Sequence, residues 1–430
     1  PAVINYGGSP GVDVFYGTND GMSRAINGNQ PPATNASPLP MGNCVLPGNS
    51  SCSIGGTPPG GELWSFVPTD FYPKLQRLYS NSPIVKMPTT PVGIVPTPQS
   101  KDYFFDGSPS VYQDGSTAYI FLAARRGGPV LYALDVSSPT APKFLWKHTD
   151  QDTGFSELGQ TWSQPKVAIL SCIQNPNYDP TNCNPSATPK LDPGYPVLVF
   201  GAGYDTNEDI EPPKADKVGR GIFILVAAAG KLLRSAKPGG SSATCSGNPC
   251  QLASMTYAMP ADVTFVDRDF DGFVDRLYAA DLGGNIWRVD LTPKTKPGYG
   301  PDTWQTTLLA ALGGTGTTKR KFFFPPDVVL TKKYDVVLAV TGDREHPLLT
   351  QQANNVVNRF YMIKDTNVGM NGAAWTPVYD NTSSTANDPP PALFNATSAN
   401  YDQTLSGFYV TLLGLDPKGV PSLGEKGVNA

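Results

Sequence analysis

The sequence is poor in the residues that enzymes use most often for acid–base and nucleophilic catalysis. It contains only two histidines, His148 and His346, and neither lies in a recognised catalytic motif. A zinc site would need more His or Cys residues at close spacing than the chain offers. We therefore predict no catalytic residues and no enzyme activity. His346 lies in the turn-like sequence TGDREHP, where a surface or turn role is expected.

Charged residues are also scarce, and no basic tract is present. Lys, Arg, Asp and Glu make up 16% of the chain, and the net charge is −4. Nucleic acids are bound mainly through clusters of Lys and Arg, so a nucleic-acid partner is not indicated. No apolar run reaches the roughly 20 residues of a membrane-spanning helix. The sequence thus predicts neither a nucleic-acid-binding protein nor a membrane span.

The chain has only six cysteines, and no two of them are adjacent. They fall into three close pairs in polar loops, although six cysteines allow about 15 pairings and the sequence alone does not choose among them. Disulfide bonding within each close pair is the simplest interpretation. Metal–thiolate sites are the alternative, but none of the pairs is a C-x-x-C. Disulfides imply an oxidising compartment, the periplasm or the cell exterior. The predicted pairs are Cys44 with Cys52, Cys172 with Cys183, and Cys245 with Cys250.

Glycine and proline are abundant, with 44 of each, and aromatic residues make up 10% of the chain. This composition favours short strands joined by turns. A unit of strand, Gly/Asp/Asn turn and strand recurs, which is typical of repeat architectures. We predict an all-β fold, a single β-propeller domain over residues 1–430; a row of separate β-sandwiches is less favoured because no linker is evident. The recurring strands are predicted in residues 14–27, 119–136, 196–205 with 219–233, 276–291, and 335–344 with 358–365.

Long polar loops interrupt this pattern, and loops of such length are often functional. The chain starts at Pro1, without a methionine or signal peptide, so we expect it to be a piece of a longer precursor. The long loops are predicted at residues 28–61, 80–100, 172–195, 235–251 and 377–400.

The most informative stretch is DRDFDGFVD, residues 267–275, which follows an apolar run and precedes a strand-like run. Calcium takes roughly six to eight oxygen ligands at about 2.3–2.6 Å, and alternating carboxylates in a tight loop can surround one ion. Gly272 would allow the sharp turn, because it has no Cβ to clash at positive φ. We therefore predict a calcium site completed by water. The predicted ligands are Asp267, Asp269, Asp271, the carbonyl oxygen of Phe273, and Asp275.

The loop differs from an EF-hand, which needs a glutamate at position twelve and a helix on each side. Position twelve here is Tyr278, and both flanks predict strands. A solvated turn without metal is the alternative. Without a cation, the four carboxylates would repel one another, and Arg268 and Arg276 would offset that repulsion only partly. We expect Asp271→Ala to abolish calcium binding and to leave the rest of the fold intact.

An ordered set of motifs resembles the C-terminal domain of the PilY/PilC family of type IV pilus tip-associated proteins. The most specific is VDRDFDGFVDRLYAADLGGNIWRVDL (residues 266–291). Single pieces occur in other propellers, but the ordered set is much harder to reach by chance. The other motifs are FYGTNDGMSRAIN (15–27), ELWSFVPTDFYPKL (62–75), YFFDGSPSVYQ (103–113), RRGGPVLYALDVSSP (125–139), LGQTWSQPKV (158–167) and VFGAGYD (199–205).

This resemblance implies a modified seven-bladed propeller with long disulfide-bearing loops. The family sequence continues past GEKGVNA (residues 424–430), so a ring that lacks its last strands is an alternative. The resemblance also implies a place at the pilus tip on the bacterial surface, reached through the periplasm and outer membrane. The implied roles are pilus assembly, adhesion, and control of pilus extension and retraction by calcium in the loop of residues 267–275. The implied partners are minor pilins and a receptor on a host cell or an abiotic surface.

Two other propeller functions compete with this interpretation. GNIWRVDL (residues 284–291) resembles the tryptophan motifs of quinoprotein (PQQ) dehydrogenases, but those enzymes often carry two adjacent cysteines, which are absent here. A carbohydrate- or receptor-binding lectin could use the polar loops around Tyr178 and Tyr195. The tryptophans are predicted to anchor blade cores rather than to stack on a cofactor. They are Trp64, Trp146, Trp162, Trp287, Trp304 and Trp375.

Overall fold

The structure is a computed structural model, and its described residues separate into two compact units. The first unit consists of Pro1–Asp152, Gln160–Gln164 and Ala228–Gly230, and the second of Thr153–Gly159, Pro165–Ala227 and Lys231–Ala430. The described residues are 1–8, 10–30, 52–175, 177, 179, 181–184, 192–210, 214–291, 303–314, 319–346, 355–368, 376–380, 393–397, 405–412, 414–415 and 421–422.

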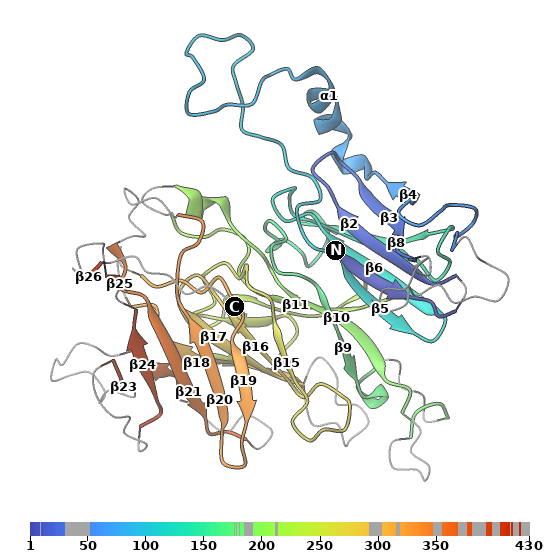
Figure 1. Cartoon of the computed structure of the whole chain (residues 1–430). Coiled ribbons are helices and arrows are strands. Elements are labelled where there is room, and N and C mark those ends of the chain that lie inside the picture. The colour runs from blue at the N-terminus through green and yellow to red at the C-terminus, as the bar shows by residue number, and fades with distance from the viewer. Residues whose placement is uncertain are drawn as a thin grey trace, which may run out of the picture. The chain divides into compact units, whose positions relative to one another are not determined.

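The first unit contains two four-stranded antiparallel sheets (Figure 1). The first sheet consists of β1 (Ala2–Asn5), β2 (Val12–Gly17), β3 (Ser23–Asn27) and β4 (Glu62–Phe66). The second sheet consists of β5 (Ser110–Asp114), β6 (Thr117–Ala123), β7 (Val130–Asp135) and β8 (Lys143–Thr149). Phe15 and Ala25 of the first sheet share one core with Ile120, Leu122 and Tyr132 of the second. Burying one apolar face of each sheet holds the pair together.

A short helical segment follows β4, and the sequence analysis did not predict it. It consists of the 3-10 helix η1 (Thr69–Phe71) and the helix α1 (Tyr72–Ser80). Proline is tolerated in the first turn of a helix, and Pro73 lies there. The helix ends at Ser80, and the next residue, Asn81, has a φ of 48° in the left-handed region typical of helix ends.

The loop after α1 is held by one arginine and exposes several apolar side chains. Arg77 donates hydrogen bonds to the carbonyl oxygens of Pro83 (2.8 Å) and Ser100 (2.7 Å). It also forms an ion pair with Asp102 at 2.8 Å. Val92 and Val95 are nevertheless almost fully exposed. The predicted loop is therefore confirmed at residues 81–100, which form an arm after α1 that exposes apolar side chains.

The second unit contains three larger sheets (Figure 1). The third sheet consists of β9 (Lys166–Leu170), β10 (Tyr195–Gly201), β11 (Ile222–Val226), β12 (Leu232–Pro238) and β14 (Cys250–Leu252). The fourth sheet consists of β13 (Thr244–Cys245), β15 (Thr264–Val266), β16 (Arg276–Ala280), β17 (Asn285–Asp290), β18 (Gln305–Ala311) and β22 (Val378–Tyr379). The fifth sheet consists of β19 (Asp327–Leu330), β20 (Asp335–Val340), β21 (Arg359–Asp365), β23 (Phe394–Asn395) and β24 (Gly407–Thr411). A separate pair is formed by β25 (Gly414–Leu415) and β26 (Pro421–Ser422), and two 3-10 helices, η2 (Cys172–Gln174) and η3 (Thr206–Asp209), lie in loops.

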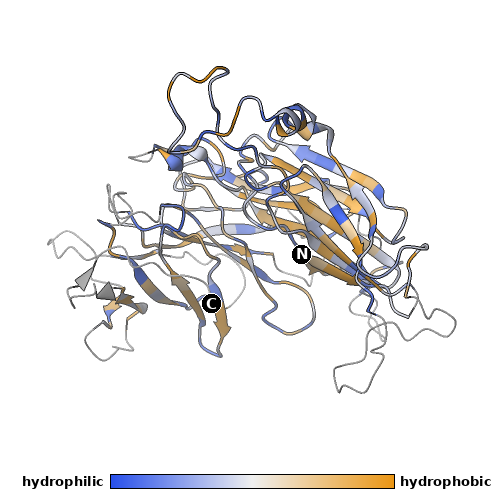
Figure 2. Ribbon diagram, turned by 45° about the horizontal axis from the view of Figure 1, so that its top comes forward, coloured by the Kyte–Doolittle hydropathy of each residue, from blue (hydrophilic) through white to orange (hydrophobic). Residues whose placement is uncertain are grey.

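The fourth sheet is buried on both faces, because it contributes to two cores. Leu277 and Trp287 pack in a core shared with the third sheet. Tyr278 and Ile286 pack in a second core shared with the fifth sheet, which includes Val337. Alternate residues of a strand point to opposite faces, so β16 and β17 serve both cores and all of their residues are buried. Hydrophobic residues gather on the strands, as Figure 2 shows.

The cysteine pairs are confirmed where both members are described. Disulfides join Cys172 to Cys183 and Cys245 to Cys250. The third predicted pair includes Cys44, which lies outside the described residues. The loop predicted at residues 235–251 is wrong in part: β12 extends to Pro238, and the short strands β13 and β14 lie inside it. These strands form because other strands offer them partners. β14 lies parallel to β12 in the third sheet, and β13 lies antiparallel to β18 in the fourth.

The fold is mostly β with long disulfide-bearing loops, and the recurring strands are confirmed as antiparallel neighbours. Five sheets of four or more strands lie in the described part of the chain. The predicted number of seven blades therefore stays a prediction, and so does a single domain over residues 1–430.

Four of the tryptophans are buried, as predicted for core anchors: Trp146, Trp162, Trp287 and Trp304. Trp64 is partly buried, and Trp375 lies outside the described residues. Among described helices, none combines the length and apolar character needed to cross a membrane.

Candidate metal centre

The acidic loop, residues 267–275, connects β15 directly to β16, as the sequence predicted. Asp275 closes it by donating its amide to the carbonyl oxygen of Val266 at 2.8 Å. Two residues at the tip have left-handed backbone, Phe270 with φ of 57° and Gly272 with φ of 92°. Such a conformation costs glycine little, but it strains a side chain such as that of Phe270. The loop therefore folds into a tight turn whose backbone conformation is favourable for Gly272 and unfavourable for Phe270.

Three of the predicted carboxylates converge in this turn. One oxygen from each of Asp267, Asp269 and Asp275 lies within 4.8 Å of the other two. Two oxygens that bind one calcium ion at about 2.4 Å can be no more than about 4.8 Å apart. The observed spacing therefore fits a shared ion. Their burial differs, since Asp275 is buried, Asp267 is partly buried and Asp269 is exposed.

Backbone amides hold these carboxylates in place. Asp267 accepts hydrogen bonds from the amides of Asp271 (3.2 Å) and Gly272 (2.8 Å), and Asp269 accepts one from Asp271 at 3.3 Å. Asp271 itself accepts a bond from the amide of Phe273 at 2.9 Å, and its carboxylate is not among the three that converge. The ligand roles of all five residues stay predictions, and the observed convergence involves neither Asp271 nor the Phe273 carbonyl.

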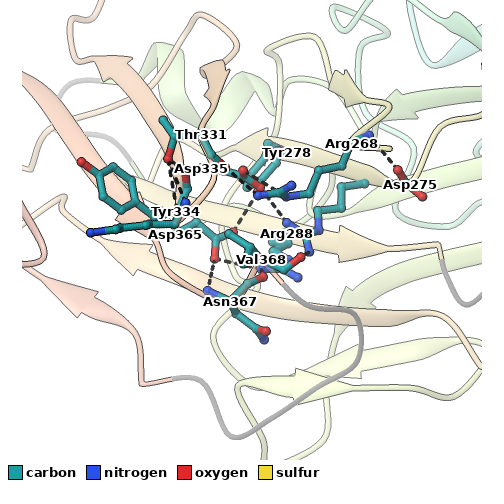
Figure 3. A network of polar contacts seen from close by, with 12 residues as sticks. Arg268, Asp275, Tyr278, Arg288, Thr331, Tyr334, Asp335, Asp365, Asn367 and Val368 are labelled. Carbon is teal, nitrogen blue, oxygen red and sulfur yellow. Dashed lines mark hydrogen bonds and ion pairs between the residues drawn. The ribbon is translucent and has the colours of Figure 1, made fainter. Parts of the chain in front are cut away.

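The loop is anchored to the sheets on both sides of its own. The amide of Val274 donates to the carbonyl oxygen of Ile169 in β9 at 2.9 Å. On the other side, Arg268 donates to the carbonyl oxygen of Thr331 at 2.8 Å and forms an ion pair with Asp335 at 3.2 Å (Figure 3). Thr331 begins the turn between β19 and β20, and Asp335 is the first residue of β20. The loop therefore contacts the third and fifth sheets as well as the fourth.

A network of buried charges lies beside the loop (Figure 3). Arg288 forms ion pairs with Asp290 at 2.7 Å and Asp365 at 2.8 Å. Burial alone would lower the pKa of Arg288, but these two carboxylates more than offset it and raise that pKa. Tyr278 donates to Asp365 at 2.7 Å, and burial, followed by the charge of Asp365, raises the pKa of Tyr278. Sequence analysis did not identify this network, because Asp365, which binds both Arg288 and Tyr278, lies 77 residues beyond Arg288 in the chain.

A second group of buried charges lies elsewhere in the second unit. Lys321 forms ion pairs with Glu208 at 2.7 Å and Asp343 at 2.8 Å. His346 contacts the same carboxylate of Asp343 at 2.9 Å and is only 5% exposed, so the predicted surface role of His346 is wrong. Burial alone would raise the pKa of Asp343, but His346 and Lys321 lower it to about 2. Asp216 lies close to Glu208, and its pKa is raised instead, to about 8.

This raised pKa predicts that the second unit loses stability as the pH rises. Burial is the main cause of the shift in Asp216, followed by the charge of Glu208; the amide of Ala258, which donates to Asp216 at 2.8 Å, opposes it. Between about pH 4 and pH 8 the folded state binds the proton that the unfolded state has released, so the free energy of unfolding falls as the pH rises. Asp216→Asn should remove this contribution. The free energy of unfolding can be measured in urea at about pH 5 and about pH 8.5 for both proteins. The value of the variant minus that of the unaltered chain should be larger at the higher pH.

The control for this experiment is Asp327→Asn, which changes an exposed aspartate of the same unit. Its stability relative to the unaltered chain should be the same at both pH values. An equal effect of Asp216→Asn at both pH values would show that Asp216 has an ordinary pKa in the folded protein.

Comparisons with known proteins agree with this fold. The family model of the PilY1 β-propeller domain matches residues 97–303. The type IV pilus biogenesis factor PilY1 of Pseudomonas aeruginosa strain UCBPP-PA14 is 29% identical over 248 residues, which cover 57% of this chain and 16% of that protein. The PilY1 homolog of Xylella fastidiosa strain Temecula1 is 26% identical over 219 residues, covering 49% of this chain and 12% of that protein. The matched segment is thus a small part of both curated relatives.

The solved structures give the same result for the fold alone. The crystal structure of the Pseudomonas aeruginosa PilY1 C-terminal domain matches with a TM-score of 0.51 and 18% sequence identity, over 96% of this chain and 69% of that one. It agrees with the β-propeller fold predicted from the sequence. Residues 97–303 are thus similar to the PilY1 β-propeller domain, and the resemblance of the chain to the PilY/PilC family is confirmed.

Proposed function

We propose that this chain acts in type IV pilus biogenesis as a calcium-binding domain that also takes part in adhesion. The observation that supports the calcium site is the convergence of three carboxylates, those of Asp267, Asp269 and Asp275, in one tight loop. The pilus role rests on the relatives, which are named as type IV pilus biogenesis factors. Those names also support a role without enzyme activity, although some propellers are enzymes.

Charge neutralisation is the proposed basis of the calcium effect. Calcium, when bound, would supply two positive charges to a loop that carries four aspartates. Without that charge, repulsion between the carboxylates opposes the convergence of Asp267, Asp269 and Asp275. The backbone amides that donate to Asp267 and Asp269 offset this repulsion only in part. A partner that contacts one arrangement of the loop would therefore sense whether calcium is bound.

The proposed location is the bacterial surface at the pilus tip, and the proposed partners are minor pilins and a receptor on a host cell or an abiotic surface. The ordered arm after α1 supports the adhesive part of the proposal. Its tip exposes Val92 and Val95, and Tyr79 at the end of α1 is also largely exposed. Apolar side chains held in this way are typical of protein–protein contacts. A lectin function remains the alternative for the polar loops, and Tyr178 lies outside the described residues.

The decisive experiment is calorimetric titration of the chelator-stripped protein with calcium, beside Asp269→Asn. The unaltered chain should bind one calcium ion with an affinity between about micromolar and millimolar. Asp269→Asn keeps the size of an exposed side chain but removes one charge and one strong ligand, so affinity should fall about tenfold or more. Asp114→Asn, at an exposed aspartate in β5 of the first unit, is the matched control and should bind normally.

The same two substitutions should then be compared in a piliated strain by counting surface pili and adherent cells. Only Asp269→Asn should change these counts. If the unaltered chain binds no calcium even at millimolar concentration, the acidic loop is an ordinary turn and the calcium part of the proposal is wrong. If calcium binds but both strains keep normal pili and adherence, the site exists without the proposed regulatory role.

A further inference from the structure

The acidic loop is attached at both of its ends to one buried carboxylate. Arg268, the second residue of the loop, forms an ion pair with Oδ1 of Asp335 at 3.2 Å. Arg276, which directly follows the loop, donates to Oδ2 of the same carboxylate at 2.7 Å. Asp335 and Arg276 are almost fully buried, whereas Arg268 is 23% exposed. The two arginines therefore hold the loop against the fifth sheet through a shared partner.

Asp335 lies where β20 of the fifth sheet begins. It is the first residue of β20 and pairs with Asp365 in β21. Arg268 also donates to the carbonyl oxygen of Thr331, at the start of the turn between β19 and β20 (Figure 3). Within that turn, the Thr331 hydroxyl donates to the carbonyl oxygen of Tyr334. A movement of Arg268 would therefore change contacts at both the beginning and the end of this turn.

Arg268 is also part of the acidic loop, because in the sequence it lies between Asp267 and Asp269, two of the residues whose carboxylates converge. Its own amide donates to Oδ2 of Asp275 at 2.7 Å. When the loop carries no cation, its carboxylates attract the guanidinium of Arg268 and compete with Asp335 for it. A cation among Asp267, Asp269 and Asp275 would remove this attraction and repel the guanidinium, which favours its contact with Asp335. Cation binding therefore favours the Arg268–Asp335 contact, and formation of this contact in turn favours cation binding.

We propose that Arg268 transmits the occupancy of the acidic loop to the turn between β19 and β20 in the neighbouring sheet. This inference rests on the proposed calcium site and adds the route and the receiving surface. Arg268 acts here as a positioning residue, since its guanidinium contacts Asp335 and Thr331 rather than the ion. The receiving turn, residues 331–334, contains two lysines and Tyr334. Its ordering by calcium would present a defined surface to a partner.

Hydrogen–deuterium exchange with and without calcium tests this route, with the amides of residues 331–336 as the readout. Coupling between two sites typically changes the binding affinity at one of them by roughly 5–150-fold when the other is occupied. In the unaltered chain we expect calcium to slow exchange of the turn about tenfold, and in Arg268→Gln less than about twofold. A purely structural role of Arg268 would speed exchange equally with and without calcium, so the calcium-dependent difference is specific to transmission. Calcium affinity is not used as the readout, because removing a positive charge beside the loop would itself strengthen binding.

The matched control is Arg220→Gln, because Arg220 is also 23% exposed and pairs with Glu157 in the same unit. It should retain the full effect of calcium on the turn. Arg268→Lys keeps the charge but cannot reach Thr331 and Asp335 with one rigid fork, so it should retain only part of the effect. Calorimetry on the same samples separates the two proposals. Calcium binding without protection of the turn, or equal protection in Arg268→Gln, would overturn the transmission alone, and absence of binding would overturn both.

Discussion

Replacing Asp281 with alanine is expected to destabilise the second unit by about 4 kcal/mol or more. Asp281 lies in the turn between β16 and β17, is fully buried, and accepts four hydrogen bonds. The donors are the amides of Gly283 and Asn285, the side-chain amide of Asn285, and the indole N–H of Trp287. Each buried donor left without a partner costs about 1–3 kcal/mol. Trp287 is also central to the core shared with the third sheet, so its displacement would weaken that core as well.

Urea unfolding monitored by tryptophan fluorescence would measure this effect. Asp327→Ala is the control, because it makes the same change at an exposed aspartate of the second unit. Substitutions at such surface positions usually change stability by less than about 0.5 kcal/mol. If Asp281→Ala cost no more than Asp327→Ala, the four hydrogen bonds would be readily replaced by water, and the turn would not be buried in solution.

The second large effect is expected from Arg276→Ala, which should cost about 3–5 kcal/mol. Arg276 is 1% exposed and holds two buried carboxylates, Asp290 at 3.1 Å and Asp335 at 2.7 Å. It also donates to the carbonyl oxygen of Val368 at 2.9 Å. Without Arg276, each of these buried carboxylates would keep only one arginine, Arg288 for Asp290 and Arg268 for Asp335. Removing one member of a buried group of charges costs more than the ion pair itself contributes. The junction between the fourth and fifth sheets should therefore loosen first.

Two variants separate the loss of charge from the loss of volume. Arg276→Met fills much of the space but cannot pair with Asp335, so it should destabilise nearly as much as Arg276→Ala. Lys166→Ala removes a cation that pairs with Asp262 at the surface of the same unit, and it should cost less than about 1 kcal/mol. A fully stable Arg276→Met protein would show that packing, rather than charge pairing, is what Arg276 contributes.

The parts of the fold that sequence predicted are those determined by local pattern. The strands of residues 276–291 alternate between two cores, and Asp, Gly and Asn mark the turn between them, so β16 and β17 were predictable. The acidic loop was predictable for the same reason, because the carboxylates that converge lie within nine residues of one another. Helix α1 was missed because it is short and proline lies at its start.

The contacts that were not predicted join residues distant in sequence. Arg276 and Asp335 are 59 residues apart, and nothing near either residue indicates its partner. The same holds for Arg268 and Thr331, and for the charges around Lys321. Burial of His346 was missed because the turn sequence contains Asp343 but gives no sign of Lys321, which binds the same carboxylate from 22 residues away. Such contacts depend on how sheets pack, and the hydrophobic pattern of one strand does not specify its polar neighbours.

The complete burial of β16 and β17 affects how this protein can evolve. A strand with both faces in a core has no position where substitution is free of consequence, so the scaffold of the acidic loop is strongly constrained. The tip of the loop is different, since Asp269, Phe270, Asp271 and Gly272 are exposed to solvent. Under the proposed calcium role, substitutions there would adjust metal affinity while leaving the scaffold unchanged. Selection would then tune the proposed calcium site to different environments through a few tip residues.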